Sequence, residues 1–402
     1  MEPFKGDHRL TGPKLAQPQA GPCVVVVAGG GLEVTPQGGA TLPVRFTEIR
    51  DWGVADYALW LELHDGSRLE LSRLARRLDE LARVIKDSRR EHFSPALLLE
   101  EPGGAVVEKG AYERRRASGE RLDTGPCAVH LQKTSIAVYP EVASPFLVPY
   151  GTIVGARHDP EAYGLALTRD DGELLLLTRF GKRTDALARG LEDKRAALAG
   201  RQSAALAALA PALGAVATRD GAELLRDGVP AGRDALDPAA PGLWDAVWKY
   251  GFNEERRPYA DVLLARATRS FAVIKETGPW GAAEGTPAAL TDRRLLYLFE
   301  IGRALVVEAP STDDAATYVF RLAGDAEAFA RALCRALAAV QFRREPIYLA
   351  ESAMRAPPHD RYAEAVRVLP ELAATRAAFL GRAIHNSVEA WKREVDEAVG
   401  RA

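Results

Sequence analysis

The stretch GPCVVVVAGGGLEVTP, residues 21–36, decides the fold because the chain uses it twice. Residues 125–140 read GPCAVHLQKTSIAVYP and follow the first stretch in step, at a spacing of 104 positions. After a two-residue insertion, Asp65-Gly66 lies opposite Asp171-Gly172. Self-similarity at a fixed spacing indicates that one supersecondary unit is used more than once. Residues that both copies share are therefore expected to be structural.

Each copy is predicted to form β-strands followed by one helix. In the first copy, residues 57–63 alternate between apolar and other side chains, which is the period of a half-buried strand. Asp65-Gly66 then predicts a two-residue hairpin. Over residues 74–90 the apolar period changes to that of an amphipathic helix. The second copy repeats this order, so Leu61 and its counterpart Leu167 are both expected to be buried.

A looser third copy is predicted toward the C-terminus, where the string LTDRRLLYL at 290–298 indicates a strand. Residues 101–124, between the first two copies, are polar and turn-rich and form either a linker or an extra hairpin. The predicted organisation is a flexible N-terminus (1–20), a first repeat (21–100), a linker (101–124), a second repeat (125–215), a helical connector (216–258), a third repeat (259–345) and a helical tail (346–402).

Several strands, an Asp-Gly hairpin and one closing helix in each copy resemble the pleckstrin-homology-like (PH-like) superfold. The string at 290–298 is similar to a strand of bacterial PH-like and GRAM-type domains. The expected fold class is therefore α+β, with two to three PH-like units, helical connectors and a helical tail. The resemblance implies modules that bind peptides, proteins or lipid headgroups. In phosphoinositide-binding members the first hairpin carries several basic residues, whereas the turns at 29–31 and 133–135 hold only Lys133.

The composition argues against several other classes of protein. A net charge of −2 over 402 residues provides no overall field for nucleic acid, so no nucleic-acid partner is expected. The three cysteines lack the spacing of a zinc site, and neither a metal nor a cofactor is expected. No recognised pattern of nucleophile and base predicts a catalytic residue. No signal peptide and no apolar run of about 18 residues is found, which favours a cytoplasmic protein.

Two groups of residues in the middle of the chain are candidates for contact with a partner. Arg114, Arg115 and Arg116 form the densest basic cluster, which could contact an anion or a lipid headgroup or be a solvated linker. Trp244 and Trp248 concentrate aromatic area in the connector. Such aromatic residues either anchor an interface with a partner or pack between the repeats.

The C-terminal segment carries one apolar stripe. Its apolar residues recur at the spacing of a helix: Leu380, Ile384, Val388, Trp391 and Val395. One apolar stripe on an otherwise charged helix must be buried against something. The stripe either docks on the chain's own domains, mediates self-association or binds a partner.

The predicted function is a non-enzymatic cytoplasmic interaction or scaffold protein, which binds a protein partner or itself through sheet edges and grooves. Two alternatives stay open. A peripheral membrane adaptor would contact lipid headgroups through Arg114–Arg116 and the loop at 278–281. An enzyme of unrecognised class would be favoured by a pocket that gathers residues from non-equivalent positions of the repeats.

Overall fold

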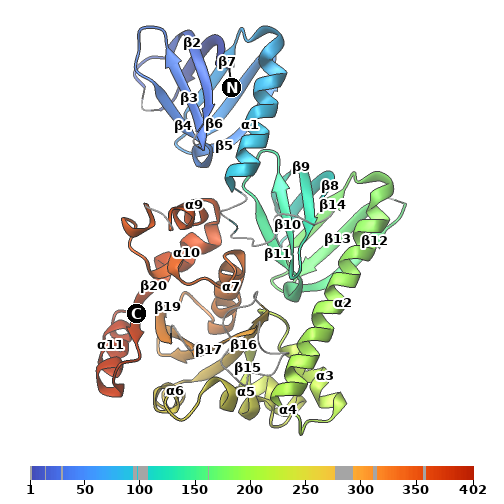
Figure 1. Ribbon diagram of the computed structural model, residues 1–402, viewed down its shortest axis with the longest axis vertical. Coiled ribbons are helices and arrows are strands. Elements are labelled where there is room, and N and C mark those ends of the chain that lie inside the picture. The colour runs from blue at the N-terminus through green and yellow to red at the C-terminus, as the bar shows by residue number, and fades with distance from the viewer. Residues whose placement is uncertain are drawn as a thin grey trace.

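The computed structural model is an α+β protein built around three β-sheets (Figure 1). It describes residues 2–13, 15–28, 30–93, 97, 107–161, 163–276, 293–310, 315–355 and 359–402. The first two sheets are antiparallel, have seven strands each and curl into half-barrels. The first lies at one end of the long axis, and the other two lie beyond it. No helix among the described residues is long and apolar enough to cross a membrane.

The first unit, residues 4–93, is an antiparallel meander followed by one helix. Its sheet has the order β4-β3-β2-β1-β7-β6-β5. The helix α1 (Leu78–Phe93) buries Leu81 and Ile85 in the same core as the inner face of the sheet. The strands are β1 (Phe4–Thr11), β2 (Gln19–Ala28), β3 (Gly31–Pro36), β4 (Leu42–Arg45), β5 (Ile49–Ala55), β6 (Ala58–Leu63) and β7 (Arg68–Ser72).

The second unit, residues 107–209, repeats this topology. Its sheet has the order β11-β10-β9-β8-β14-β13-β12, and the helix α2 (Thr184–Leu209) follows it. The pairing register is also repeated, since Val25 faces Val34 in the first unit and Val129 faces Val138 in the second. The strands are β8 (Val107–Arg115), β9 (Arg121–Leu131), β10 (Ser135–Pro140), β11 (Phe146–Pro149), β12 (Ile153–Asp159), β13 (Gly164–Arg169) and β14 (Leu174–Thr178).

Both units begin earlier than the sequence predicted. The expectation of a flexible N-terminus over residues 1–20 was wrong, because β1 pairs with β2 on one side and β7 on the other. Its buried positions include only two large apolar residues, Phe4 and Leu10, with His8 between them. The apolar alternation was therefore too weak to mark a strand. Of the predicted segment 101–124, the part from residue 107 onward forms the extra hairpin, since β8 pairs with the start of β9, and residues 101–106 lie outside the described residues.

The two copies share an interior but differ on the outer face of the sheet. Leu61 and Leu167 are fully buried, as predicted. On β3 of the first unit, the outward-facing Glu33 is exposed to solvent. Its counterpart on β10 of the second unit, Ala137, is fully buried beside the half-barrel. Helix α7 of the third unit packs against β11, the strand that pairs with β10, whereas Glu33 on the corresponding strand of the first unit faces solvent.

The third unit, residues 215–402, has another architecture and is not a third half-barrel. Its six-stranded sheet has the order β15-β16-β17-β18-β19-β20, and alternate residues of the central strands enter two cores on opposite faces. Both faces are covered by helices. The strands are β15 (Ala231–Gly232), β16 (Arg269–Glu276), β17 (Arg293–Ile301), β18 (Ala304–Ala309), β19 (Ala316–Arg321) and β20 (Phe379–Ile384).

The helices of the third unit divide between the two faces of its sheet. On one face lie α3 (Ala215–Leu224), α4 (Arg233–Ala239), α5 (Leu243–Gly251), α6 (Arg257–Leu264) and α11 (Val388–Gly400). On the other face lie α7 (Ala326–Ala339), α8 (Glu345–Tyr348), α9 (Asp360–Val368) and α10 (Pro370–Ala378). The edge strands β15 and β20 come from the predicted connector and tail, so the sequence boundaries of the third repeat cut through this sheet.

Contacts between side chains hold the units together. The tip of the β13–β14 hairpin docks on α7, where Arg331 pairs with Asp170 at 3.0 Å and Arg335 approaches Asp171 at 3.5 Å. The first unit contacts the rest through α1 and β5. His92 lies 3.3 Å from Glu364 of α9, and the indole of Trp52 donates to a carbonyl after β10.

Candidate functional site

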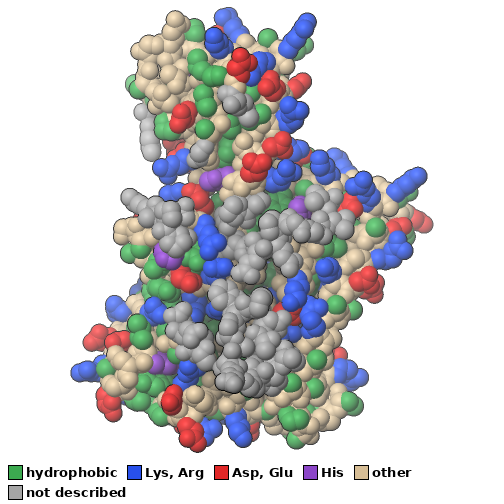
Figure 2. Space-filling model, viewed as in Figure 1, with side chains coloured by type: hydrophobic (Ala, Val, Ile, Leu, Met, Phe, Trp, Pro, Cys, Tyr) green, Lys and Arg blue, Asp and Glu red, His purple; other side chains and the backbone are tan. Residues whose placement is uncertain are grey.

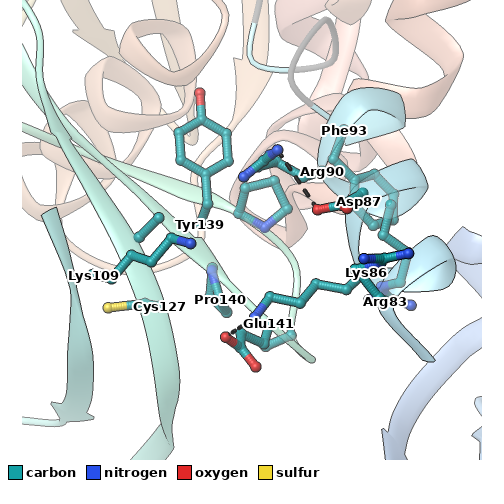
Figure 3. Close-up of a pocket in the computed structure, with 14 residues that line it drawn as sticks. Arg83, Lys86, Asp87, Arg90, Phe93, Lys109, Cys127, Tyr139, Pro140 and Glu141 are labelled. Carbon is teal, nitrogen blue, oxygen red and sulfur yellow. Dashed lines mark hydrogen bonds and ion pairs between the residues drawn. The ribbon is translucent and has the colours of Figure 1, made fainter. Parts of the chain in front are cut away.

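A cleft of about 340 Å³ lies between α1 of the first unit and the outer ends of β8, β9 and β10 of the second (Figure 3). It gathers residues from non-equivalent positions of the two copies. Six come from α1, of which Arg89 and Phe93 belong to its buried face, and the others come from the second unit. The lining residues are Arg83, Lys86, Asp87, Arg89, Arg90, Phe93, Lys109, Cys127, Ala128, Tyr139, Pro140, Glu141, Ala143 and Pro145.

The cleft is positively charged, since five basic side chains face two carboxylates. Lys86 pairs with Glu141 across the two units, and Arg90 lies 3.7 Å from Asp87 on the same helix. Lys109 is exposed and has no ion-pair partner among the described residues. This positive charge also affects the ionisation of the nearby His130. The pKa of His130 is lowered by burial and by the charge of Arg90.

Arg89 forms hydrogen bonds to both units that border the cleft. Its side chain is buried, and its guanidinium donates to the carbonyl of Phe46 in the first unit and to that of Val142 in the second. Burial lowers its pKa to about 10, so the group stays charged at neutral pH. Because two backbone carbonyls replace the lost hydration, Arg89 positions α1 against the β10–β11 segment.

The remaining walls are apolar and chemically inert. Phe93, Ala128, Pro140 and Pro145 provide carbon surface between the charged groups. Burial raises the pKa of the Cys127 thiol to about 12, with a smaller contribution from the charge of Glu141. A thiol with so high a pKa is protonated at neutral pH and is a poor nucleophile. The cleft thus combines cationic and apolar surface, which suits binding of an acidic and partly apolar ligand.

The sequence contained a signal for half of this site. Arg83, Lys86 and Arg90 recur every three to four residues along RVIKDSRR, residues 83–90, and so share one face of a helix. In the sequence alone, that face has the pattern of the solvated side of an amphipathic helix. The other half could not be found in this way, because the approach of α1 to β8–β10 depends on how the two units dock.

The structure places the predicted basic cluster in ion pairs rather than in a free anion site. Arg114 lies 2.8 Å from Glu173 and stacks over the ring of Phe146. Arg115 pairs with its strand neighbour Glu113, and Arg116 lies 2.9 Å from Glu120. None of the three side chains lines the cleft.

Lys133, the one basic residue of the predicted first hairpins, is also engaged. Its ammonium group lies 2.7 Å from the carboxylate of Glu276 at the end of β16. Glu276 is buried and additionally pairs with Arg201 at 2.8 Å and Arg293 at 3.1 Å. Burial opposes ionisation of Glu276, but its hydrogen bonds to Arg201 and Lys133 prevail, and its pKa is lowered. This network fixes the second unit to the third.

The two tryptophans of the connector belong to the core of the third unit. Trp244 and Trp248 lie on α5 and are 1% and 9% exposed. Their rings stack 6.0 Å apart, and both contact the ring of Tyr297 on β17. The sequence left open whether they anchor a partner or pack inside the protein, and the structure places both rings in a core of the third unit. They cover one face of the third sheet.

The predicted C-terminal stripe is divided between a strand and a helix. Leu380 and Ile384 lie on β20, which pairs with β19, and Ile384 is 52% exposed. Val388 begins α11, where Trp391 is fully buried. The indole of Trp391 donates to the hydroxyl of Thr317 on β19 at 2.7 Å. The tail therefore docks on the chain's own third sheet, and the expectation that one helix carries the whole stripe was wrong.

Comparisons with known proteins do not assign the chain to a family. No protein-family model matches the chain, and no curated protein is similar to it in sequence.

Proposed function

We propose that the first two units are PH-like and that the protein is a non-enzymatic interaction protein, whose basic cleft binds an acidic, partly apolar segment of a partner protein. The observation that carries this proposal is the excess of five basic over two acidic side chains in a cleft with apolar walls. Charge-assisted hydrogen bonds from lysine and arginine to carboxylates provide affinity and orientation. The apolar walls would bury side chains between the acidic residues of such a segment.

The assignment to the PH-like superfold is supported by topology. Each unit is a seven-stranded antiparallel meander whose first strand lies between the second and the seventh. In each, one helix follows the last strand and packs against the inner face of the half-barrel. Fold alone does not determine function, so the proposal rests on the cleft.

Binding is favoured over catalysis by the state of the groups in the cleft. A pocket made from non-equivalent repeat positions was the arrangement expected of an enzyme, and the cleft has it. However, its thiol is held protonated, and both carboxylates lie beside a cation. General acid–base or nucleophilic catalysis needs a group with its pKa tuned toward neutrality.

A lipid-headgroup role receives less support from the described residues. Arg114, Arg115, Arg116 and Lys133 all pair with carboxylates. On the face shown in Figure 2, basic and acidic side chains are interspersed over the first and second units and form no continuous basic surface. The loop at 278–281, the other predicted lipid contact, lies outside the described residues.

The proposal is tested by selecting random short peptides from a displayed library on the full chain. The selection is repeated on a variant with Arg83→Glu and Arg90→Glu, which reverses two charges of the cleft. We expect enrichment of peptides that combine acidic and apolar residues. By fluorescence anisotropy, the double variant should bind them about tenfold more weakly or worse, because each charged hydrogen bond contributes about 1.5–3 kcal/mol. Added salt should weaken binding to the wild type.

Arg76→Glu is the matched control. Arg76 is exposed, lies in the short 3-10 turn that directly precedes α1, and does not line the cleft. This variant carries the same kind of charge reversal on the first unit and should bind as the wild type does. Selected peptides without acidic enrichment, or equal binding by all three proteins, would refute the proposed site.

A further inference from the structure

A second cavity, of about 310 Å³, lies between the second and third units, away from the basic cleft. It is bounded by the short helix that joins β11 to β12, by the middle of α2 and by the segment after α3. Gly151 closes one end, because a Cβ there would lie 2.1 Å from the carbonyl oxygen of Asp227. The lining residues are Tyr150, Gly151, Ile153, Glu192, Arg195, Ala196, Leu198, Ala199, Gln202, Ala222, Arg226 and Asp227.

Arg195 in this cavity is the repeat counterpart of Arg89. The spacing of 106 residues that relates Tyr57 to Tyr163 also relates Arg89 to Arg195. Both guanidinium groups bond the backbone next to the short helix of their own unit, Arg89 at Phe46 and Arg195 at Ile153. Arg89 has a second carbonyl partner in the neighbouring unit. Arg195 has no such second partner among the described residues, and it lines a cavity instead.

Arg226 provides a second guanidinium in the same cavity. Its side chain makes no hydrogen bond or ion pair with any described residue. Its pKa is lowered by burial, while the carboxylate of Asp170 acts in the opposite direction. Asp170 is already shared by Arg331 at 3.0 Å and Arg335 at 3.5 Å. The positive charge of Arg226 is therefore only partly compensated.

The other buried polar groups of the cavity are occupied. Asp227 accepts hydrogen bonds from Lys275 and from the backbone of Glu276. The amide of Gln202 donates to the carbonyl of Leu225, and its oxygen accepts from Arg293. Glu192 lies at the exposed rim and interacts with Arg195. The two arginines are thus the groups left to recognise a ligand.

We propose that this cavity binds a small molecule that carries an oxyanion, a phosphate or a carboxylate, on a compact apolar body. Guanidinium groups offer paired N–H donors that match the oxygens of either group. Tyr150, Ile153 and Leu198 provide the apolar wall for the body of the ligand. The volume lies at the lower end of the range of small-molecule sites, about 300–1,000 Å³.

Protection from phenylglyoxal, which modifies arginine, tests the site in the unaltered full chain. Phenyl phosphate and benzoate are the probes, and modified arginines are located by peptide mass spectrometry. We expect a saturating probe to slow modification of Arg195 and Arg226. The exposed Arg189 on α2 and Arg219 on α3 should react as before. Protection by one probe alone identifies the oxyanion as phosphate or carboxylate.

Protection of none of these arginines, or of all four equally, would overturn the proposal. Protection confined to Arg83 and Arg90 would overturn it as well, because the anion would then lie in the basic cleft.

Calorimetric titration with the protective probe provides an independent measurement. Arg226→Gln is the decisive variant, since this side chain has no hydrogen bond whose loss would disturb the fold. It should bind about tenfold more weakly or worse, because a charged hydrogen bond is lost. Arg219→Gln, on the adjacent helix, should bind as the wild type does. Equal affinities of Arg226→Gln and the wild type would overturn the proposal.

Discussion

Leu61 and Leu167 occupy equivalent positions inside the two half-barrels, and replacement of either by alanine should destabilise its unit. Both side chains are fully buried, and each faces a buried leucine across the hairpin, Leu69 and Leu175 respectively. Truncation of a buried leucine to alanine costs about 2–5 kcal/mol through lost transfer energy and the cavity left behind. For a unit of 60–100 residues that melts by itself, each kcal/mol lowers Tm by about 4–8 °C. We therefore expect a decrease of about 8 °C or more.

Differential scanning calorimetry of the full chain is the assay, with one exposed control in each unit. Val54→Ala in the first unit and Leu122→Ala in the second remove carbon from side chains that are 45% and 38% exposed. Such surface substitutions usually change stability by no more than about 0.5 kcal/mol. If Leu61→Ala and Leu167→Ala melted like these controls, the register that relates the two copies would be wrong.

Three further measurements address the cleft, the junctions and the tail. Cys127 should resist Ellman's reagent at neutral pH in the folded protein and react after denaturation, since its pKa is about 12; a fast reaction of the folded protein would contradict this burial. The lowered pKa of Glu276 stabilises the fold above its ordinary value of 4.5, and this contribution is lost as the pH falls below it. The stability of Glu276→Gln should accordingly depend less on pH in acid than that of the wild type, and equal slopes in urea titrations would refute the assignment. Deletion of residues 380–402 removes α11 and all of β20 except Phe379, and it should produce a less stable, aggregating protein. A truncated protein that stays monomeric and equally stable would mean that the tail serves a partner.

The sequence predicted the interior of the repeated units better than their limits. Val25, Val34 and their counterparts alternate with outward residues, so burial fixes the register of the central strands. β1 could not be predicted from the sequence, because its register depends largely on backbone pairing with β2 and β7, and such pairing leaves no apolar pattern. In β20, Leu380 and Ile384 happen to have helical spacing, but Gly381 between them disfavours a helix and β19 offers an open edge.

The two proposed binding sites were less predictable than the cores for a physical reason. Each cavity lies where two units meet, and the docking of units depends on surface shape and on ion pairs far apart in the sequence. Arg201 and Glu276 are one such pair, and His92 and Glu364 are another. A period in the sequence reports which face of an element is buried, and it does not report which other element buries it.

The contrast between the copies explains where recognition would arise in such a molecule. Both interiors are constrained by the same packing, whereas the outer faces of the copies differ. In the second unit, Ala137 is buried where the first unit has the exposed Glu33, and residues of β8, β9 and β10 form one wall of the basic cleft. In the first unit, Arg89 kept two carbonyl partners, whereas its counterpart Arg195 kept one and faces a cavity. Two units with the same core but different contacts to their neighbours would thus provide two different binding sites. Both of the proposed sites lie where units meet.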